Sequence, residues 1–368
     1  MSWLQQRDSE YLYVLRAVSI FVIVLGHVGG FWFWRPWSEF LHVSVPVFFF
    51  VSGAVSYNSF LQGKSLSLYI KKRVTGLIIP YYCICFLALL VYLVLTKRLP
   101  KFSLGYFLDW LTITPGNKIM PFPLGQVWFL HTLLIIPIIS PVFFFLYQKR
   151  SFLFPLFLVC SVLVSFIQMK SNISPTFMVA GHNLFEPLVH SLFFCLGFLI
   201  LDLPKLHSAS FSITAGGVFL GLSVFLVKIL NLNPDYGFHT FPPDFYYVAG
   251  SLCTIWALVS LQDCIMKVYR RFPLVHGPVR FLFRHTFAIY LLHTFGIFLA
   301  EEVFGLAHPE HKDIIYGVFK LFIVLGITFS ISLLFTKVSS LITELVLRLM
   351  SRRTLTPVLP KKWQRTTA

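Results

Sequence analysis

Ten apolar stretches, each close to the length of a membrane-spanning helix, follow one another along this sequence. A helix needs about 20 apolar residues to cross the hydrocarbon core of a bilayer. The stretches cover residues 11–31, 39–60, 76–96, 126–147, 152–169, 183–201, 210–230, 245–266, 281–302 and 314–337. The sequence therefore predicts an all-α, polytopic bundle of about ten membrane-spanning helices.

The composition fits a chain that uses lipid as its solvent. Hydrophobic residues make up 57% of the 368 residues and charged residues 12%, whereas a soluble domain carries about 25% charged residues. One transmembrane domain is expected over residues 1–337. A basic cytoplasmic tail is expected at 338–368, and its lysines and arginines would attract anionic membrane lipid.

The net charge of +16 reflects basic residues that lie between the apolar stretches and in the tail. With both termini in the cytoplasm, about twenty lysines and arginines fall on the cytoplasmic side and about seven on the other, as the positive-inside rule requires. This bias predicts an N-in, C-in topology. Because it also accounts for the positive charge, no nucleic-acid partner is expected.

The first apolar stretch carries two chargeable side chains, Arg16 and His27. A spacing of eleven residues is about three helical turns, so both lie on one face, roughly 16 Å apart along the axis. Ionisable residues inside membrane spans are costly and usually functional. The alternative is that Arg16 extends to the interface and His27 is a packed polar residue. The shared face favours a functional pair that an elongated ligand would bridge.

Histidine is the side chain best suited to take a proton from a hydroxyl near neutral pH. A hydroxyl that attacks a thioester needs such a base, and the resulting oxyanion needs a hydrogen-bond donor or a cation nearby. We find no Gly-x-Ser-x-Gly elbow that would indicate a serine nucleophile. The histidines and the six cysteines lack metal-site spacing, so no metal is expected. His182, His239, His308 and His311 are expected to be solvated on loops.

The Arg-(ten residues)-His pattern resembles the signature of the acyltransferase 3 family. Further similar segments follow in the order expected for that family. They are Phe48-Phe49-Phe50-Val51-Ser52-Gly53, the basic segment from Tyr69 to Tyr81, Val127-Trp128-Phe129-Leu130, and Tyr290-Leu291-Leu292-His293.

This resemblance implies a ten-span membrane enzyme that takes an acyl group, expected to be acetyl, from acyl-CoA. The acceptor would be a hydroxyl of a carbohydrate such as lipopolysaccharide, exopolysaccharide or a similar glycan, in a bacterial cytoplasmic membrane. It implies that His27 is the general base and that Arg16 positions the donor. Lys71, Lys72 and Arg73 are the expected acyl-CoA contacts. Many relatives carry a second arginine three residues after Arg73, and this chain has Gly76 there.

Four further residues are weaker candidates for substrate contacts: Glu186, Trp128, His293 and Ser52. Glu186 either orients His27 or is an interfacial carboxylate. Trp128 either lines a cavity or belongs to an aromatic belt. His293 is expected to be a structural hydrogen-bonding residue more than a second base. Aromatic residues between Phe241 and Tyr247 form either a shaped loop or a sugar-stacking surface.

Two alternative functions remain open from the sequence. Ten spans with few buried charges also suit a sugar or glycolipid transporter or flippase, which would neither bind nor hydrolyse acyl-CoA. Within enzymes, the transferred group is either acetyl or succinyl.

Overall fold

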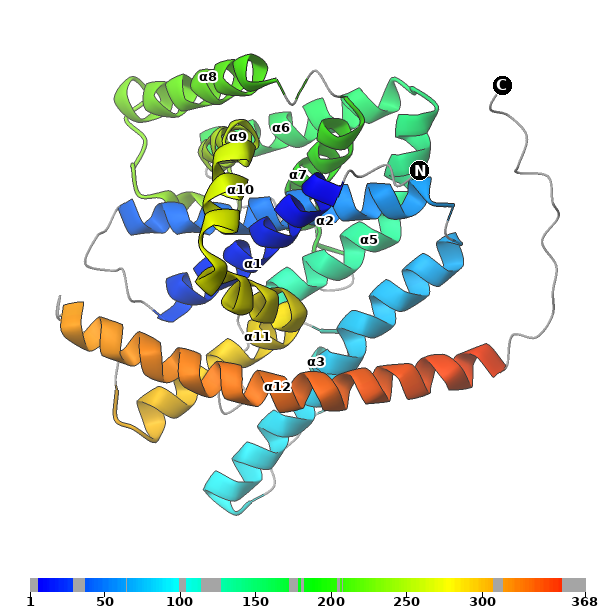
Figure 1. The fold of residues 1–368 in the computed structure, drawn as a ribbon, viewed down its shortest axis with the longest axis vertical. Coiled ribbons are helices and arrows are strands. Elements are labelled where there is room, and N and C mark those ends of the chain that lie inside the picture. The colour runs from blue at the N-terminus through cyan, green and yellow to red at the C-terminus, as the bar shows by residue number, and fades with distance from the viewer. Residues whose placement is uncertain are drawn as a thin grey trace.

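The computed structural model of the protein describes residues 6–28, 37–63, 65–98, 104–113, 127–171, 178–179, 182–203, 206, 208–306 and 314–352. Over these residues the chain is almost entirely helical (Figure 1). The α-helices are α1 (Gln6–Val28), α2 (Ser44–Leu61), α3 (Leu66–Thr96), α4 (Leu104–Leu111), α5 (Val127–Gln148), α6 (Leu153–Ser171), α7 (Phe185–Asp202), α8 (Ala209–Lys228), α9 (Phe245–Ser260), α10 (Gln262–Arg271), α11 (His276–Glu302) and α12 (Ile314–Arg352). Short 3-10 helices lie at η2 (Trp37–Val43), η4 (Tyr236–His239) and η5 (Pro273–Val275). An antiparallel pair of two-residue strands, β1 (Met178–Val179) and β2 (His182–Asn183), precedes α7.

The predicted set of spans is confirmed in the described part of the chain. Nine helices are long and apolar enough to cross a membrane, and the pair α9 and α10, bent by 60° at the break between them, makes ten if it is counted as one span. The bend follows Ser260, inside the stretch that the sequence predicts as one helix over 245–266. The sequence of α10, Gln-Asp-Cys-Ile-Met-Lys-Val-Tyr-Arg-Arg, is strongly amphipathic and charged, so it favours the membrane surface over the interior.

Two other helix ends differ from the sequence prediction. Helix α3 begins at Leu66, ten residues before the predicted stretch at 76–96, so its three basic residues lie within its first turns. Helix α12 continues to Arg352, beyond the predicted end of the last span at 337. At α3 the hydrophobic pattern marks the membrane core but not the helix, which begins in the basic segment before it. At α12 the residues after 337 stay mostly apolar, so the predicted end of that stretch was too early.

Helices α2 and α7 pack most closely at two glycines. A Cβ atom at Gly53 would collide with the backbone carbonyl of Phe194, and one at Gly197 would collide with the backbone of Phe50 and Ala54. Small residues let membrane helices approach closely enough for their backbones to touch. Around this crossing lies the core of the bundle, where Phe49, Phe193, Phe194 and Phe198 are fully buried.

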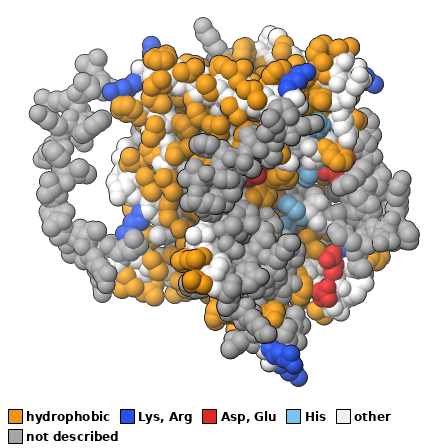
Figure 2. All heavy atoms as spheres, turned by 180° about the vertical axis from the view of Figure 1, so that it is seen from behind, with side chains coloured by type: hydrophobic (Ala, Val, Ile, Leu, Met, Phe, Trp, Pro, Cys, Tyr) orange, Lys and Arg blue, Asp and Glu red, His pale blue; other side chains and the backbone are white. Residues whose placement is uncertain are grey.

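Helix α1 lies inside the bundle and packs against α2 on one side and α11 on the other (Figure 1). Helix α12 packs against α11 and crosses α3. The outer surfaces of these helices are apolar: Val94 of α3 is 75% exposed and Phe322 of α12 is 68% exposed. Hydrophobic side chains also cover much of the face in Figure 2. A surface of this kind is suited to contact with lipid.

A buried ion pair joins α11 to α12. Lys320 is fully buried, and its Nζ lies 2.6 Å from Oε1 of Glu301. An unpaired lysine at this depth would be strongly destabilising, so the carboxylate makes its burial possible.

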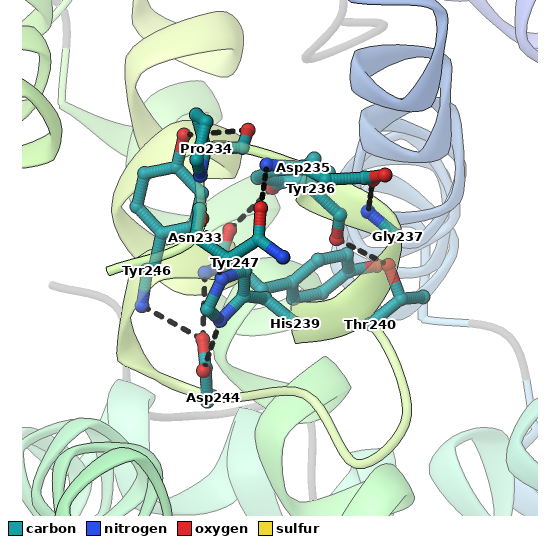
Figure 3. Close-up of polar contacts among 10 residues, drawn as sticks. All are labelled: Asn233, Pro234, Asp235, Tyr236, Gly237, His239, Thr240, Asp244, Tyr246 and Tyr247. Atoms are coloured by element: carbon teal, nitrogen blue, oxygen red, sulfur yellow. Dashed lines mark hydrogen bonds and ion pairs between the residues drawn. The ribbon is translucent and has the colours of Figure 1, made fainter. Parts of the chain in front are cut away.

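A compact loop between α8 and α9 is ordered around one carboxylate (Figure 3). Asp244 caps α9 through Oδ1, which accepts hydrogen bonds from the backbone N–H groups of Tyr246 and Tyr247 at 2.9 and 3.1 Å. Its Oδ2 lies 2.5 Å from Nδ1 of His239, and Nε2 of His239 lies 2.9 Å from the carbonyl oxygen of Asn233. Both partners of His239 can only accept hydrogen bonds, so both ring nitrogens carry hydrogen and the ring is an imidazolium.

The expectation that His239 is solvated is therefore wrong, because the residue is 7% exposed and ion-paired. The side chain of His182 and residues His308 and His311 lie outside what the structure describes.

The His239–Asp244 pair predicts a pH-dependent stability. Burial by itself would lower the pKa of His239, but the hydrogen bond and charge of Asp244 outweigh it and raise the pKa above the ordinary value. A raised pKa in the folded state stabilises the fold fully below the unfolded pKa, and this stabilisation is lost as pH rises through the folded pKa. We expect the melting temperature in detergent to fall as pH rises from about 6.5. The His239→Gln variant should melt lower at acidic pH and lose that dependence. An equal slope in both proteins would contradict the assignment.

Candidate active site

The predicted pair on α1 lies at two separate places. Arg16 lines a cavity of about 180 Å³, which also contacts Ile20 one turn later. His27, two turns beyond Ile20, does not line this cavity and is exposed. The structure therefore does not place the two side chains in a single pocket.

The cavity is enclosed by five helices: α1, α2, α3, α5 and α11, with one residue from α7. Its walls combine aromatic and aliphatic side chains with two hydroxyls from α2 and three cations. The lining residues are Arg16, Ile20, Phe48, Phe49, Ser52, Ser56, Lys72, Arg73, Gly76, Leu77, Phe129, Leu133, Ile136, Pro137, Phe194, Thr286, Phe287 and Tyr290. Of the predicted contacts, Arg16, Ser52, Lys72 and Arg73 meet here, and Lys71 does not line the cavity. Gly76, the position at which the family resemblance implied an arginine, also lines it.

Arg16 is held by aromatic rings and has no carboxylate partner in the described part of the chain. Its guanidinium carbon lies 5.6 Å from the ring centre of Phe48 and 5.4 Å from that of Phe283. These cation–π contacts hold the group without neutralising it. Its Nε is buried without a hydrogen-bond partner.

Arg73 enters the same cavity from α3, with its guanidinium carbon 5.6 Å from the Tyr69 ring centre. The two arginines lie close enough for their charges to repel each other. Lys72 adds a third positive charge to the lining. Because the described residues provide no carboxylate to neutralise this cluster, the cavity is suited to an anionic ligand.

His27 is oriented by its own helix. Its Nδ1 lies 2.9 Å from the carbonyl oxygen of Ile23. A carbonyl oxygen can only accept a hydrogen bond, so Nδ1 carries the hydrogen and Nε2 carries the free lone pair. This is the tautomer that a general base needs, with its basic nitrogen directed away from the helix backbone.

Helix α11 continues from the cavity to His27. Thr286, Phe287 and Tyr290 line the cavity, and His293 follows one turn after Tyr290. The ring centres of His293 and His27 lie 4.9 Å apart. His293 is fully buried, and its Nδ1 lies 2.6 Å from the carbonyl oxygen of Tyr290. The structure thus brings His27 and His293 together at the end of the α1–α11 contact.

Glu186 does not orient His27 in the described structure. Its backbone carbonyl accepts a hydrogen bond from Nδ1 of His190 at 2.7 Å, and the Nδ1 of His27 is already taken by Ile23. Trp128 also lies outside the cavity. It packs against the edge of Phe241, with ring centres 4.6 Å apart, and contacts His190 at 5.8 Å.

Two histidines that the sequence analysis did not select lie close to the site. His190 of α7 is buried between Phe49 and Trp128. His42 of η2 is electrostatically coupled to His27, and its Nδ1 lies 3.2 Å from Oγ1 of Thr240 in the loop before α9. Neither residue belongs to a spacing motif. The spacing of His190 four residues after Glu186 would have placed both on one helix face.

The described residues contain no group of three His, Cys, Asp or Glu side chains positioned to hold a metal ion. The chemistry that these residues offer is proton transfer by His27, hydrogen bonding by hydroxyls, and binding of an anion by three cations.

Comparison with known proteins gives one match. The sequence model of a family described as an acyltransferase domain matches residues 9–337, which is most of the chain and includes every residue of the cavity. No curated protein and no solved structure matches the chain. The match reaches each of the candidate membrane spans of the described chain and ends within α12, so the protein is a multi-pass membrane acyltransferase. The chain belongs to the acyltransferase 3 family.

Proposed function

We propose that the protein transfers an acetyl group from acetyl-CoA to a hydroxyl of a carbohydrate, such as a lipopolysaccharide or exopolysaccharide, in a bacterial cytoplasmic membrane. The observation that carries this proposal is a cavity lined by three cations without a carboxylate partner among the described residues, with an exposed histidine base two turns farther along α1, outside that cavity. The transporter alternative is set aside, because the family is one of acyltransferases.

The donor is proposed to bind through its phosphates to Lys72 and Arg73 on α3. Phosphate groups pair well with lysine and arginine, and arginine offers a fork of donors that matches their oxygens. Arg16 is too far along α1 to touch an atom bound at His27, since the spacing is roughly 16 Å. Its proposed role is therefore to hold the donor between its phosphates and its thioester.

The reaction is proposed to be direct. The Nε2 atom of His27 removes the proton of the acceptor hydroxyl, and the oxygen attacks the thioester carbonyl carbon. A carbon–oxygen bond forms, the carbon–sulfur bond breaks, and the CoA thiolate takes up the proton that His27 received. With both termini in the cytoplasm, CoA binds and leaves from the cytoplasmic side and the glycan approaches from the opposite side.

The test is acyl transfer by the purified protein in lipid vesicles, with radiolabelled acetyl-CoA and, in parallel, succinyl-CoA. Free CoA and labelled glycan are measured together, with glycan extracts and methyl hexosides as acceptors. We expect CoA release with acetyl-CoA and label on the glycan. A folded protein that neither binds nor turns over any acyl-CoA would contradict the proposal, and faster transfer of succinyl groups would replace acetyl by succinyl.

Adjacent lysines on α3 provide a matched test of donor binding. Lys72 lines the cavity and Lys71 does not. A hydrogen bond to a charged group contributes about 1.5–3 kcal/mol, so Lys72→Gln should raise the KM for acetyl-CoA about tenfold or more. The kcat at saturation should change little, because Lys72 touches no reacting atom. Lys71→Gln is the control and should leave KM near the original value. Equal effects of the two substitutions would contradict the proposed donor site.

A further inference from the structure

His293 has a nitrogen that nothing in the described structure satisfies. The residue is fully buried, and its Nε2 has no hydrogen-bond partner. Its Nδ1 donates to the carbonyl oxygen of Tyr290 at 2.6 Å, so Nε2 carries a lone pair and needs a donor. Burial of an unsatisfied acceptor is unfavourable. The unpaired Nε2 therefore points to a hydrogen-bond donor that the described residues do not supply.

The neighbouring histidine cannot be that donor. His27 has the same arrangement, with Nδ1 bonded to the carbonyl oxygen of Ile23 and a lone pair on Nε2. Two lone pairs do not bond to each other. The rings nevertheless lie with their centres 4.9 Å apart, tilted by 44°. The two rings therefore present two hydrogen-bond acceptors side by side, and a ligand that offers two O–H donors close together would match both.

We propose that His27 and His293 together bind a vicinal diol of the acceptor. His27 faces the hydroxyl that becomes acylated, and Nε2 of His293 accepts a hydrogen bond from the hydroxyl on the adjacent carbon. This inference rests on the proposed acyl transfer and narrows its acceptor to carbohydrates in which the acylated position has a free hydroxyl neighbour. His293 is then a substrate-binding residue that sets which hydroxyl reaches the base.

The closeness of the two rings is compatible with a pair of neighbouring hydroxyls. The ring centres are 4.9 Å apart, and a hydrogen bond spans about 3 Å between heavy atoms, so hydroxyls on adjacent carbons can reach one ring each. A site that hydrogen-bonds a substrate hydroxyl discriminates strongly against an analogue lacking it, because its own polar group is then left buried and unpaired. Selectivity for acceptors with a neighbouring hydroxyl should therefore depend on His293 and should be lost when this residue is replaced.

The experiment compares two small diols as acceptors for the full-length protein in vesicles with labelled acetyl-CoA. Glycerol carries hydroxyls on adjacent carbons, and propane-1,3-diol carries them on separated carbons. We expect the wild type to acetylate glycerol at least tenfold faster than propane-1,3-diol. In His293→Phe the ratio should fall to about one, and His293→Gln, whose side-chain oxygen can accept the same hydrogen bond, should restore part of it. His285→Phe is the matched control on α11, because His285 bonds to Thr336 away from the site.

The ratio separates a binding role from a structural one. A structural defect lowers both rates together and leaves their ratio unchanged, so an unchanged ratio in His293→Phe would overturn the inference. Equal rates for the two diols in the wild type would overturn it as well. Failure of the proposed function looks different: a folded wild type would release no CoA with either diol or with water, and the inference would fall with it.

Discussion

The His27→Ala variant is expected to lose acyl transfer by a factor of about 10²–10⁴ in kcat, the usual contribution of a positioned general base. The KM for acetyl-CoA should change little, because His27 does not line the cation-containing cavity where the donor is proposed to bind. The reason for the large effect is geometric. The bond from Nδ1 to Ile23 leaves Nε2 as the free lone pair beside His293, and the described site offers no second exposed base in that position.

Steady-state rates of CoA release and of label transfer, measured on vesicles with matched amounts of folded protein, check this prediction. His285→Ala serves as the control, since this histidine lies on α11 and bonds to Thr336. It should retain activity. Transfer by His27→Ala at close to the original rate would exclude His27 as the base. A lower yield of folded His27→Ala protein, with the kcat per folded molecule unchanged, would assign His27 a structural role.

The Gly197→Ala variant is expected to be strongly destabilised, although alanine is normally the better helix former. The added Cβ would collide with the backbone of Phe50 and Ala54 on α2. Overpacking of this kind typically costs about 1–3 kcal/mol, and more where the neighbour is backbone that cannot rotate away. The clash would separate α2 from α7 and displace the cavity wall that α2 provides through Phe48, Phe49 and Ser52.

Gly217→Ala on α8 is the matched control, because nothing lies within 4 Å of a Cβ atom built there. The same substitution should be neutral or stabilise the protein by up to about 1 kcal/mol, through helix propensity alone. Thermal unfolding in detergent compares the two variants. If Gly197→Ala melts at the same temperature as Gly217→Ala, the backbone contact between α2 and α7 is not a determinant of stability.

The architecture was predictable because membrane burial imposes a simple rule on sequence. Each span must be apolar over the thickness of the hydrocarbon core, and that rule identifies every helix that crosses it. The rule is silent about where a helix ends in the interface. It therefore placed the start of α3 near 76 instead of Leu66 and missed the bend after Ser260. The positions of these helix ends depend on charged side chains, which are stable at the membrane surface because water and lipid headgroups solvate them there.

The site was predictable where its residues share one helix. Arg16 and His27 could be paired by their spacing, and Lys72 and Arg73 by their position before an apolar stretch. The partners contributed by other helices could not be placed in this way. The approach of His293 to His27 depends on how α11 packs on α1, and the closeness of His42 depends on η2. The pairing of His239 with Asp244, five residues later, depends on the fold of the loop between them. A loop has no periodic sequence pattern, so this ion pair could not be predicted.

The uncompensated charge of the cavity has a consequence for regulation in the proposed mechanism. Three cations line the cavity: Arg16, Lys72 and Arg73. No carboxylate of the described chain pairs with them, so their attraction for an anionic ligand is not reduced. Free CoA carries the same phosphates as its acetyl ester, so cations that hold the donor hold the product as well. Product release then competes with donor binding at every turnover. The rate of glycan modification would follow the ratio of acetylated to free CoA in the cytoplasm. The degree of acetylation of glycans outside the cell would then depend on the metabolic state inside it.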